Sequence, residues 1–194
     1  HIFPLRVKYP QGDEKQLLKA VTGREVPSGG LPLEIGAIVA NVGTVHAVYE
    51  AVVYNKPLIE RVVTVSGGAI ADPQNLKVRI GTPVKSLIEE CGGLTEDPKK
   101  IVMGGPMMGF TLYDLDTPVI KGTSGILALT AKEVRAARTT ACLSCGRCVA
   151  ACPMGLDPTR LFKKIDHGEY GVAMEMGLMD CKECGSCAFT CPAR

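Results

Sequence analysis

The chain has 194 residues and a nearly balanced charge, with 22 basic against 20 acidic side chains. This balance indicates neither a nucleic acid nor an anionic membrane as partner, and no apolar run reaches the roughly 18 residues of a membrane-spanning helix. With 46% hydrophobic residues the chain can bury a substantial core. It begins with His1 rather than methionine and shows no signal-peptide pattern, so we expect a piece of a longer protein.

The first 58 residues favour helices around one short strand. A strand that leads through a glycine into a helix is typical of an α/β unit, so residues 1–58 are predicted to be the C-terminal part of such a domain. The elements expected there are a helix over 13–21 stopped by Gly23, a loop over 26–32, a buried strand over 37–42, and an apolar helix over 45–54 with Thr44 as its N-cap.

Residues 59–130 favour strands, with one helix among them. Strand, strand, helix and then further strands is the order of a β-grasp domain, and the fold class of the whole chain is predicted to be α+β. The expected strands cover 61–65, 75–80, 101–103 and 126–129, and the expected helix runs from a cap at Thr82-Pro83 to Cys91.

Two glycine-rich segments in this region are predicted to be turns. Gly104 to Gly109 follows a strand, as a phosphate-binding loop would, but it lacks the G-x-G-x-x-G order and Pro106 removes a backbone donor. Gly67-Gly68 lies between two strands. We therefore expect no nucleotide site here, and no acid–base pair or nucleophile indicates a catalytic residue.

Eight of the nine cysteines form two blocks of identical spacing near the end of the chain. The order Cys-x2-Cys-x2-Cys-x3-Cys-Pro is the spacing of bacterial ferredoxins that bind [4Fe–4S] clusters. Three thiolates spaced by two residues can surround three corners of one cubane, and a glycine in each loop, Gly146 or Gly185, supplies the necessary freedom. The first block is Cys142, Cys145, Cys148 and Cys152, and the second block is Cys181, Cys184, Cys187 and Cys191.

We expect crossed ligation, because the fourth cysteine of such a block serves the other cluster. Structural zinc, which prefers separated cysteine pairs, and a [3Fe–4S] form of one cluster are the alternatives. Outside the blocks, Cys91 is expected to be a buried structural thiol, and His46 and His167 to be ordinary surface or packed residues. The expected ligand sets are Cys142, Cys145, Cys148 and Cys191 for one cluster, and Cys152, Cys181, Cys184 and Cys187 for the other.

The segments around the blocks favour helices. The linker between the blocks contains a helix start at Asp157-Pro158 and a second short helix over 170–176. Thr130 to Glu133 has the pattern of a capping box, which would open a helix leading into the first block. Residues 131–194 are therefore predicted to form an α-helical ferredoxin-type module with two [4Fe–4S] clusters.

Several segments together resemble the C subunit of the Rnf electron-transport complex, over essentially the whole chain. The cysteine blocks alone would indicate only a ferredoxin, and the combination with earlier segments makes the resemblance specific. In that family the middle region, here 59–130, is a soluble-ligand-binding β-grasp (SLBB) domain, and an earlier domain similar to the flavin subunit of respiratory complex I binds FMN and NADH. Besides the blocks, the resemblance rests on Lys8 to Gly12, Thr22 to Pro27, Asn41 to Thr44 and Gly104 to Gly109.

The resemblance implies an electron-transfer relay through two [4Fe–4S] clusters, in a peripheral subunit of a membrane-bound, ion-translocating ferredoxin:NAD oxidoreductase. It implies a place on the cytoplasmic side of the inner (plasma) membrane, with the other subunits of the complex as partners and ferredoxin as a further candidate. Residues 1–58 would be only the tail of the flavin domain. The glycine-rich flavin and NADH loops are absent, so no residue is assigned to these cofactors and the chain alone is not expected to oxidise NADH.

Two other functions fit parts of the pattern. The nearest is the related cobalamin reductase of propanediol-utilising microcompartments, a soluble flavoprotein with the same β-grasp and cluster modules. The other is a pure binding module, in which the SLBB domain recognises a ligand and the clusters are structural. Neighbouring genes for integral-membrane subunits would separate the first from the Rnf assignment, and a reversible redox titration would exclude the second.

Overall fold

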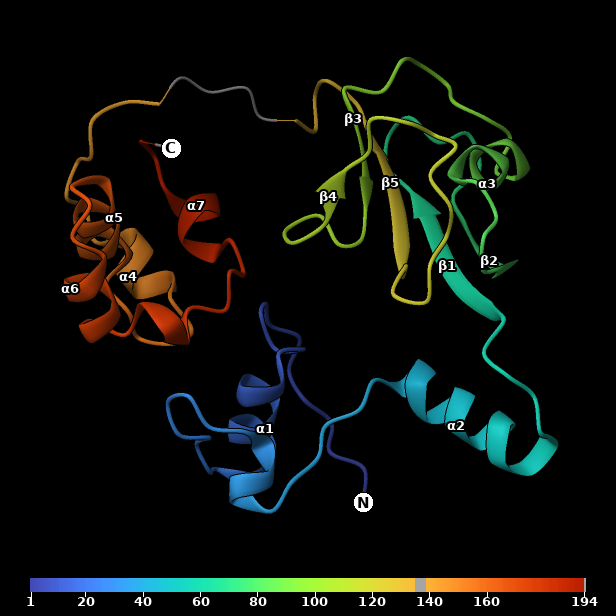
Figure 1. Cartoon of the computed structure of the whole chain (residues 1–194). Coiled ribbons are helices and arrows are strands. Elements are labelled where there is room, and N and C mark those ends of the chain that lie inside the picture. Colours follow the sequence, from blue (N-terminus) through green and yellow to red (C-terminus); the bar gives the residue numbers. More distant parts are fainter. Residues whose placement is uncertain (135–138, 194) are drawn as a thin grey trace. The chain divides into compact units, whose positions relative to one another are not determined.

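A computed structural model gives the fold of residues 1–134 and 139–193 (Figure 1). Contacts divide the chain into two compact units, one with residues 1–41 and the described part of 138–194, the other with the described part of 42–137. Helices and one mixed sheet make the chain α+β, as predicted. The module boundaries at 58 and 130 stay a prediction, because contacts do not report where one family module ends. No helix in the described residues is long and apolar enough to cross a membrane.

The second unit is built on a five-stranded sheet with the order β2-β1-β5-β3-β4. The parallel pair β1 and β5 lies in its interior, and all other pairs are antiparallel. The sequence predicts four of these strands and misses β4, which is only two residues long. The bounds are β1 (Glu60–Ser66), β2 (Gln74–Arg79), β3 (Lys100–Met103), β4 (Phe110–Thr111) and β5 (Gly125–Leu129).

The core of this unit lies between the sheet and helix α3 (Val84–Glu90), which Figure 1 shows beside β1 and β2. Alternate residues of β1, Val63 and Val65, are fully buried, as a strand with one covered face requires. Leu87 of α3 packs into the same cluster, with 1% of its surface exposed. A helix packed against a mixed sheet with a parallel central pair agrees with the predicted β-grasp order.

The ends of α3 differ in part from the prediction. Thr82 does not cap the helix, because its hydroxyl donates to the backbone oxygen of Arg79 and the N-cap residue is Pro83. At the other end Cys91 is fully buried within the core cluster. This burial agrees with the expected structural thiol and raises the pKa of the Cys91 thiol.

Both glycine-rich segments are turns, as predicted. Gly104 to Gly109 connects β3 to β4, and the amide of Gly109 donates to the backbone oxygen of Gly105. At Gly67 the φ angle is +111°, and a Cβ there would lie 2.7 Å from the backbone carbon of Ala128 and collide with its oxygen. A close approach of two backbones therefore requires glycine at 67.

The segment between the two units differs from the prediction. Residues 37–41 form no strand, and the helix α2 (Val42–Tyr54) begins before Thr44, which therefore cannot be its N-cap. Ile38, expected to be buried, is 81% exposed. A run of apolar β-branched residues predicts a strand only where a neighbouring strand can pair with it, and the described residues provide none here.

The first unit contains short helices, of which the sequence predicts α1, α5 and α6. The helix α1 (Glu14–Thr22) begins at Asp13, whose carboxylate accepts from two backbone amides, and ends at Gly23 in the left-handed region. In the linker, Asp157 caps α5 (Pro158–Asp166) by accepting from the amide of Arg160. The remaining helices of the unit are η1 (Pro32–Ile35), α4 (Arg147–Ala151), α6 (Tyr170–Glu175), η2 (Leu178–Asp180) and α7 (Ser186–Thr190).

Only the Glu133 half of the predicted capping box forms, and the helix expected after it is not found in the described residues. The carboxylate of Glu133 accepts from both the amide and the hydroxyl of Thr130, at 2.9 and 3.1 Å. It also accepts from the amide of Gly68 at 3.0 Å, which ties this turn to the end of β1. Residues 131–134 form only a turn and 139–146 are not helical, while 135–138 lie outside the described residues.

Candidate metal centres

The two cysteine blocks form two loops of the same conformation. Ser144 and Glu183, at corresponding positions, both have left-handed φ angles, +52° and +49°. Gly146 and Gly185 follow two residues later with φ angles of +70° and +76°. In each loop the backbone amide two residues after the first cysteine donates to that cysteine's sulfur at 3.4 Å. The repeated spacing therefore specifies a repeated backbone shape, and not only a repeated composition.

Each loop continues into a five-residue helix, and these two helices contact each other. In α4 and α7 the third cysteine of a block lies in the first turn, and the fourth cysteine, Cys152 or Cys191, is the C-cap residue. Both C-cap residues are extended, with ψ angles of 117° and 122°. Since α4 packs against α7, the two blocks are neighbours in the fold, as ligands shared between two clusters must be.

All eight block cysteines are free thiols, none lying deep in the core. Cys142, Cys145 and Cys181 are exposed, and the other five are partly buried. Burial raises the pKa of the Cys187 thiol, and Cys181 and Cys184 add to the rise. Iron binds the thiolate, so a metal at this block must displace the Cys187 proton.

The donor set fits two iron–sulfur clusters. Among the described residues no three Cys, His, Asp or Glu side chains converge closely enough to hold one metal ion. In a cubane each thiolate binds a different iron atom at a different corner, so a cluster does not require three side chains to converge on one ion. Backbone amides that already donate to Cys142 and Cys181 are the kind of contact that stabilises a ligating thiolate.

Several contacts between the cluster module and the start of the chain are not predictable from the sequence. The phenol of Tyr9 donates to the backbone oxygen of Cys184 at 2.6 Å. The amide of Gln16 donates to the backbone oxygen of Pro153 at 3.3 Å. The partners are separated by 175 and 137 residues, and no local pattern marks either of them. Tyr9 lies within Lys8 to Gly12, a segment that carries the family resemblance, but that resemblance does not indicate this contact.

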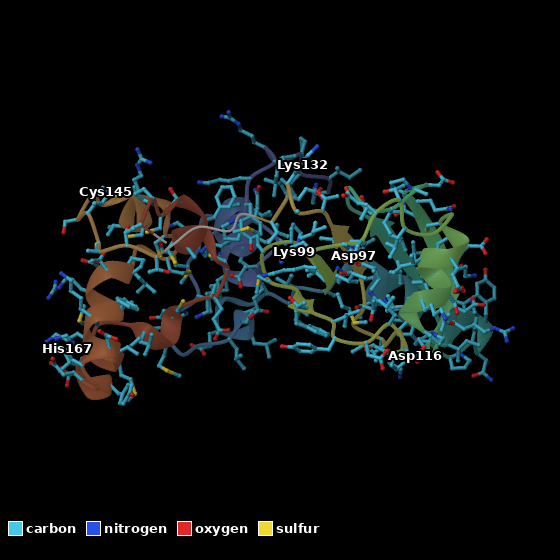
Figure 2. The ribbon with its side chains drawn as sticks, turned by 90° about the horizontal axis from the view of Figure 1, so that it is seen from above. Asp97, Lys99, Asp116, Lys132, Cys145 and His167 are labelled. Atoms are coloured by element: carbon cyan, nitrogen blue, oxygen red, sulfur yellow. The ribbon has the colours of Figure 1, made fainter. Side chains whose placement is uncertain are left out.

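His46 and His167 lie outside these loops. His46 lies on α2, 3.8 Å from the carboxylate of Glu50 one helical turn later. His167 is the C-cap residue of α5, and Figure 2 shows it well separated from Cys145. Both are exposed surface residues, which agrees with the expectation for them.

Three family models match successive parts of the chain. Residues 1–50 match the Nuo51 FMN-binding domain, residues 62–111 the SLBB domain, and residues 141–194 the 4Fe-4S dicluster domain. The last match confirms the prediction of iron–sulfur clusters and favours them over zinc. The first fits an FMN site elsewhere in the family's longer chain.

Curated relatives match over most of this chain. The identity is 55% with the C subunit of the "Proton-translocating ferredoxin:NAD(+) oxidoreductase complex" of Clostridium ljungdahlii, covering 82% of this chain and 35% of the relative. It is 50% with the C subunit of the "Ion-translocating oxidoreductase complex" of Rhodobacter capsulatus, covering 92% and 34%. It is 48% with the C subunit of the "Na(+)-translocating ferredoxin:NAD(+) oxidoreductase complex" of Acetobacterium woodii, covering 82% and 36%. The chain thus spans about a third of the length of these relatives, and over most of its own length it is a homologue of the C subunits of ion-translocating ferredoxin:NAD oxidoreductase complexes.

Proposed function

We propose that this chain is an electron-transfer module that carries two [4Fe–4S] clusters within a C subunit of this kind. The observation that carries the proposal is the equivalence of the two cysteine loops, down to the left-handed residues Ser144 and Glu183. A non-glycine residue in the left-handed region costs about 1–3 kcal/mol. Two such residues at matching positions indicate that both loops are shaped around the same kind of ligand.

We propose crossed ligation for the two clusters. Cys148 and Cys152 lie at opposite ends of α4, four residues apart, which is about 6 Å along a helix axis. Cys152 therefore lies about one helical turn beyond the third thiol of its block, outside the loop, and the same holds for Cys191 in α7. The contact between α4 and α7 lets each fourth cysteine reach the other block. The sets are Cys142, Cys145, Cys148 with Cys191, and Cys181, Cys184, Cys187 with Cys152.

The protein's own contribution is to hold the thiolates, order the loops around them and limit access of water. A bound [4Fe–4S] cluster accepts and releases one electron. Helices α5 and α6 close the linker between the two blocks, and α5 contacts α4 and α6. For the second unit, whose sequence indicates no catalytic residue, we propose a role in docking or as a spacer.

We further propose that the chain acts in a membrane-associated complex. The relatives are named as subunits of ion-translocating oxidoreductase complexes, two of them with ferredoxin and NAD(+) in the name. Other subunits of such a complex would be the partners of this chain, and ferredoxin a redox partner. A peripheral place on the cytoplasmic side of the membrane fits these partners. A soluble cobalamin reductase is the alternative, and genes for membrane subunits beside this one would decide against it.

The decisive experiment is anaerobic reconstitution with iron and sulfide, followed by metal analysis and EPR. We expect eight iron atoms and eight sulfides per chain, from two four-iron sites, and reversible reduction by dithionite. Zinc without inorganic sulfide would refute the proposal.

Crossing is tested with Cys152→Ala, compared with Cys148→Ala as the matched variant on the same helix. We expect Cys152→Ala to damage the cluster of Cys181, and Cys148→Ala to damage that of Cys142. If both variants damage the same cluster, the ligands are not crossed.

A further inference from the structure

Residues near the start of the chain make polar contacts with residues at or beside the proposed ligands of one cluster. Tyr9 donates to the backbone oxygen of Cys184 itself. Gln16 reaches the residues directly after Cys152, with its amide nitrogen 3.3 Å from the oxygen of Pro153 and 3.0 Å from the sulfur of Met154. Cys152 and Cys184 are far apart in the sequence, but crossed ligation assigns both to the same cluster.

Charged contacts secure the peptide before Cys184. Asp13 lies 3.7 Å from the ammonium of Lys182, with the two side chains only 23% and 21% exposed. Asp180 accepts a hydrogen bond of 2.6 Å from the hydroxyl of Ser28 and lies 4.0 Å from the ammonium of Lys15. Ion pairs that are largely shielded from water fix geometry better than exposed ones. Residues 180–184, which contain the first two cysteines of the second block, are thus held from several directions.

We propose that residues 9–28, here called the N-terminal strap, position the cluster of Cys152, Cys181, Cys184 and Cys187, and that Tyr9 and Gln16 are positioning residues that set its reduction potential. The inference rests on the proposed function, because it requires the two clusters and their crossed ligands. It goes beyond that function by giving the N-terminal region a role at one of the two clusters.

The direction of the effect follows from charge. Reduction adds a negative charge to the cluster, and outer contacts of the ligands are among the factors that set the potential. The phenol hydrogen of Tyr9 neutralises part of the negative end of the Cys184 carbonyl, and the Gln16 amide does the same at Pro153. Without these donors, negative dipole ends beside the ligands are left uncompensated and reduction becomes less favourable. Loss of either donor should lower the potential of this one cluster.

The test is an EPR-monitored redox titration of the reconstituted whole chain, with Tyr9→Phe and Gln16→Leu as the variants. Cys181→Ala, which removes a ligand of one cluster only, identifies its signal beforehand. Tyr170→Phe is the matched control, since Tyr170 lies in the same unit on α6 and is 61% exposed.

We expect each variant to shift the reduction equilibrium of the Cys181 cluster by roughly two- to tenfold toward the oxidised form, where tenfold corresponds to about 59 mV for a one-electron couple. The cluster of Cys142 should keep its potential, and Tyr170→Phe should change neither. The inference is overturned if both clusters shift equally, if Tyr9→Phe and Gln16→Leu move different clusters, or if neither variant moves any potential. Failure of the wild-type chain to assemble two clusters would instead refute the proposed function, and this inference with it.

Discussion

Replacement of Gly67 by alanine should destabilise the second unit more than any ordinary glycine substitution. Gly67 has a φ angle of +111°, and an added Cβ would lie 2.7 and 2.8 Å from the backbone carbon and nitrogen of Ala128. Ala128 belongs to β5, which pairs with β1 on one side and β3 on the other. The backbone at 128 therefore cannot yield without disturbing the centre of the sheet.

The expected loss in the free energy of unfolding of Gly67→Ala has two parts. The unfavourable φ angle costs about 1–3 kcal/mol for a residue with a Cβ. Gly81→Ala carries only this cost, because its φ angle is +96° and a Cβ there would meet nothing within 4 Å. Forcing extra atoms into a packed site adds typically ~1–3 kcal/mol. We expect Gly67→Ala to lose more free energy of unfolding than Gly81→Ala, and the difference should equal this second cost. That is a large share of a small domain's stability of about 5–15 kcal/mol.

The assay is denaturant unfolding of wild type, Gly67→Ala and Gly81→Ala, followed by far-UV circular dichroism. Gly122→Ala serves as the neutral reference, since it has neither a left-handed φ angle nor an atom within 4 Å of its Cβ. Equal free energies of unfolding for Gly67→Ala and Gly81→Ala would refute the argument from close approach.

Three further predictions concern the core, acid stability and redox activity. Leu87→Ala removes a side chain that is 1% exposed and should cost about 2–5 kcal/mol in the free energy of unfolding, whereas Leu33→Ala, 64% exposed, should cost little. Backbone amides of Thr130 and Gly68 hold the pKa of Glu133 below the usual value of a glutamate. The ionised carboxylate should therefore stabilise the fold at a pH above that usual value, and this stabilisation should disappear as the pH falls through the lower pKa of the folded state. The difference in melting temperature between wild type and Glu133→Gln should shrink on acidification, and a constant difference would contradict this. The reconstituted chain should be bleached by dithionite but stay oxidised with NADH alone, because hydride transfer needs a flavin that passes electrons on singly; rapid bleaching by NADH would show a nucleotide site within these 194 residues.

Local sequence signals predict most of the elements correctly. Asp13 and Gly23 delimit α1, and Asp157-Pro158 begins α5, because caps act on backbone groups within their own turn. The alternation in β1 predicts its buried residues Val63 and Val65. The predictions are wrong where an element forms only if another part of the chain can pair with it. Residues 37–41 have strand-like composition but no strand to pair with.

The chemistry of the candidate site was predictable from the sequence, but its surroundings were not. Eight cysteines with a ferredoxin spacing indicate the chemistry by themselves, and the match to a 4Fe-4S dicluster domain agrees with it. The contacts of Tyr9 and Gln16 to the cysteine module depend on a chain that returns after more than a hundred residues. Such contacts leave no periodicity and no motif in the sequence.

The left-handed residues in the two loops link conformation to function. Ser and Glu are chemically unlike, and neither favours a positive φ angle as glycine does, yet Ser144 and Glu183 adopt nearly the same one. The residue types therefore do not impose this conformation, and we infer that the shared Cys-x2-Cys-x2-Cys loop does. Strain that recurs at equivalent positions of two loops, beside amides that donate to Cys142 and Cys181, marks function rather than accident. We propose that each loop supplies three of the four ligands of one cluster, and that the contact between α4 and α7 brings the fourth cysteine of each block close to the other block.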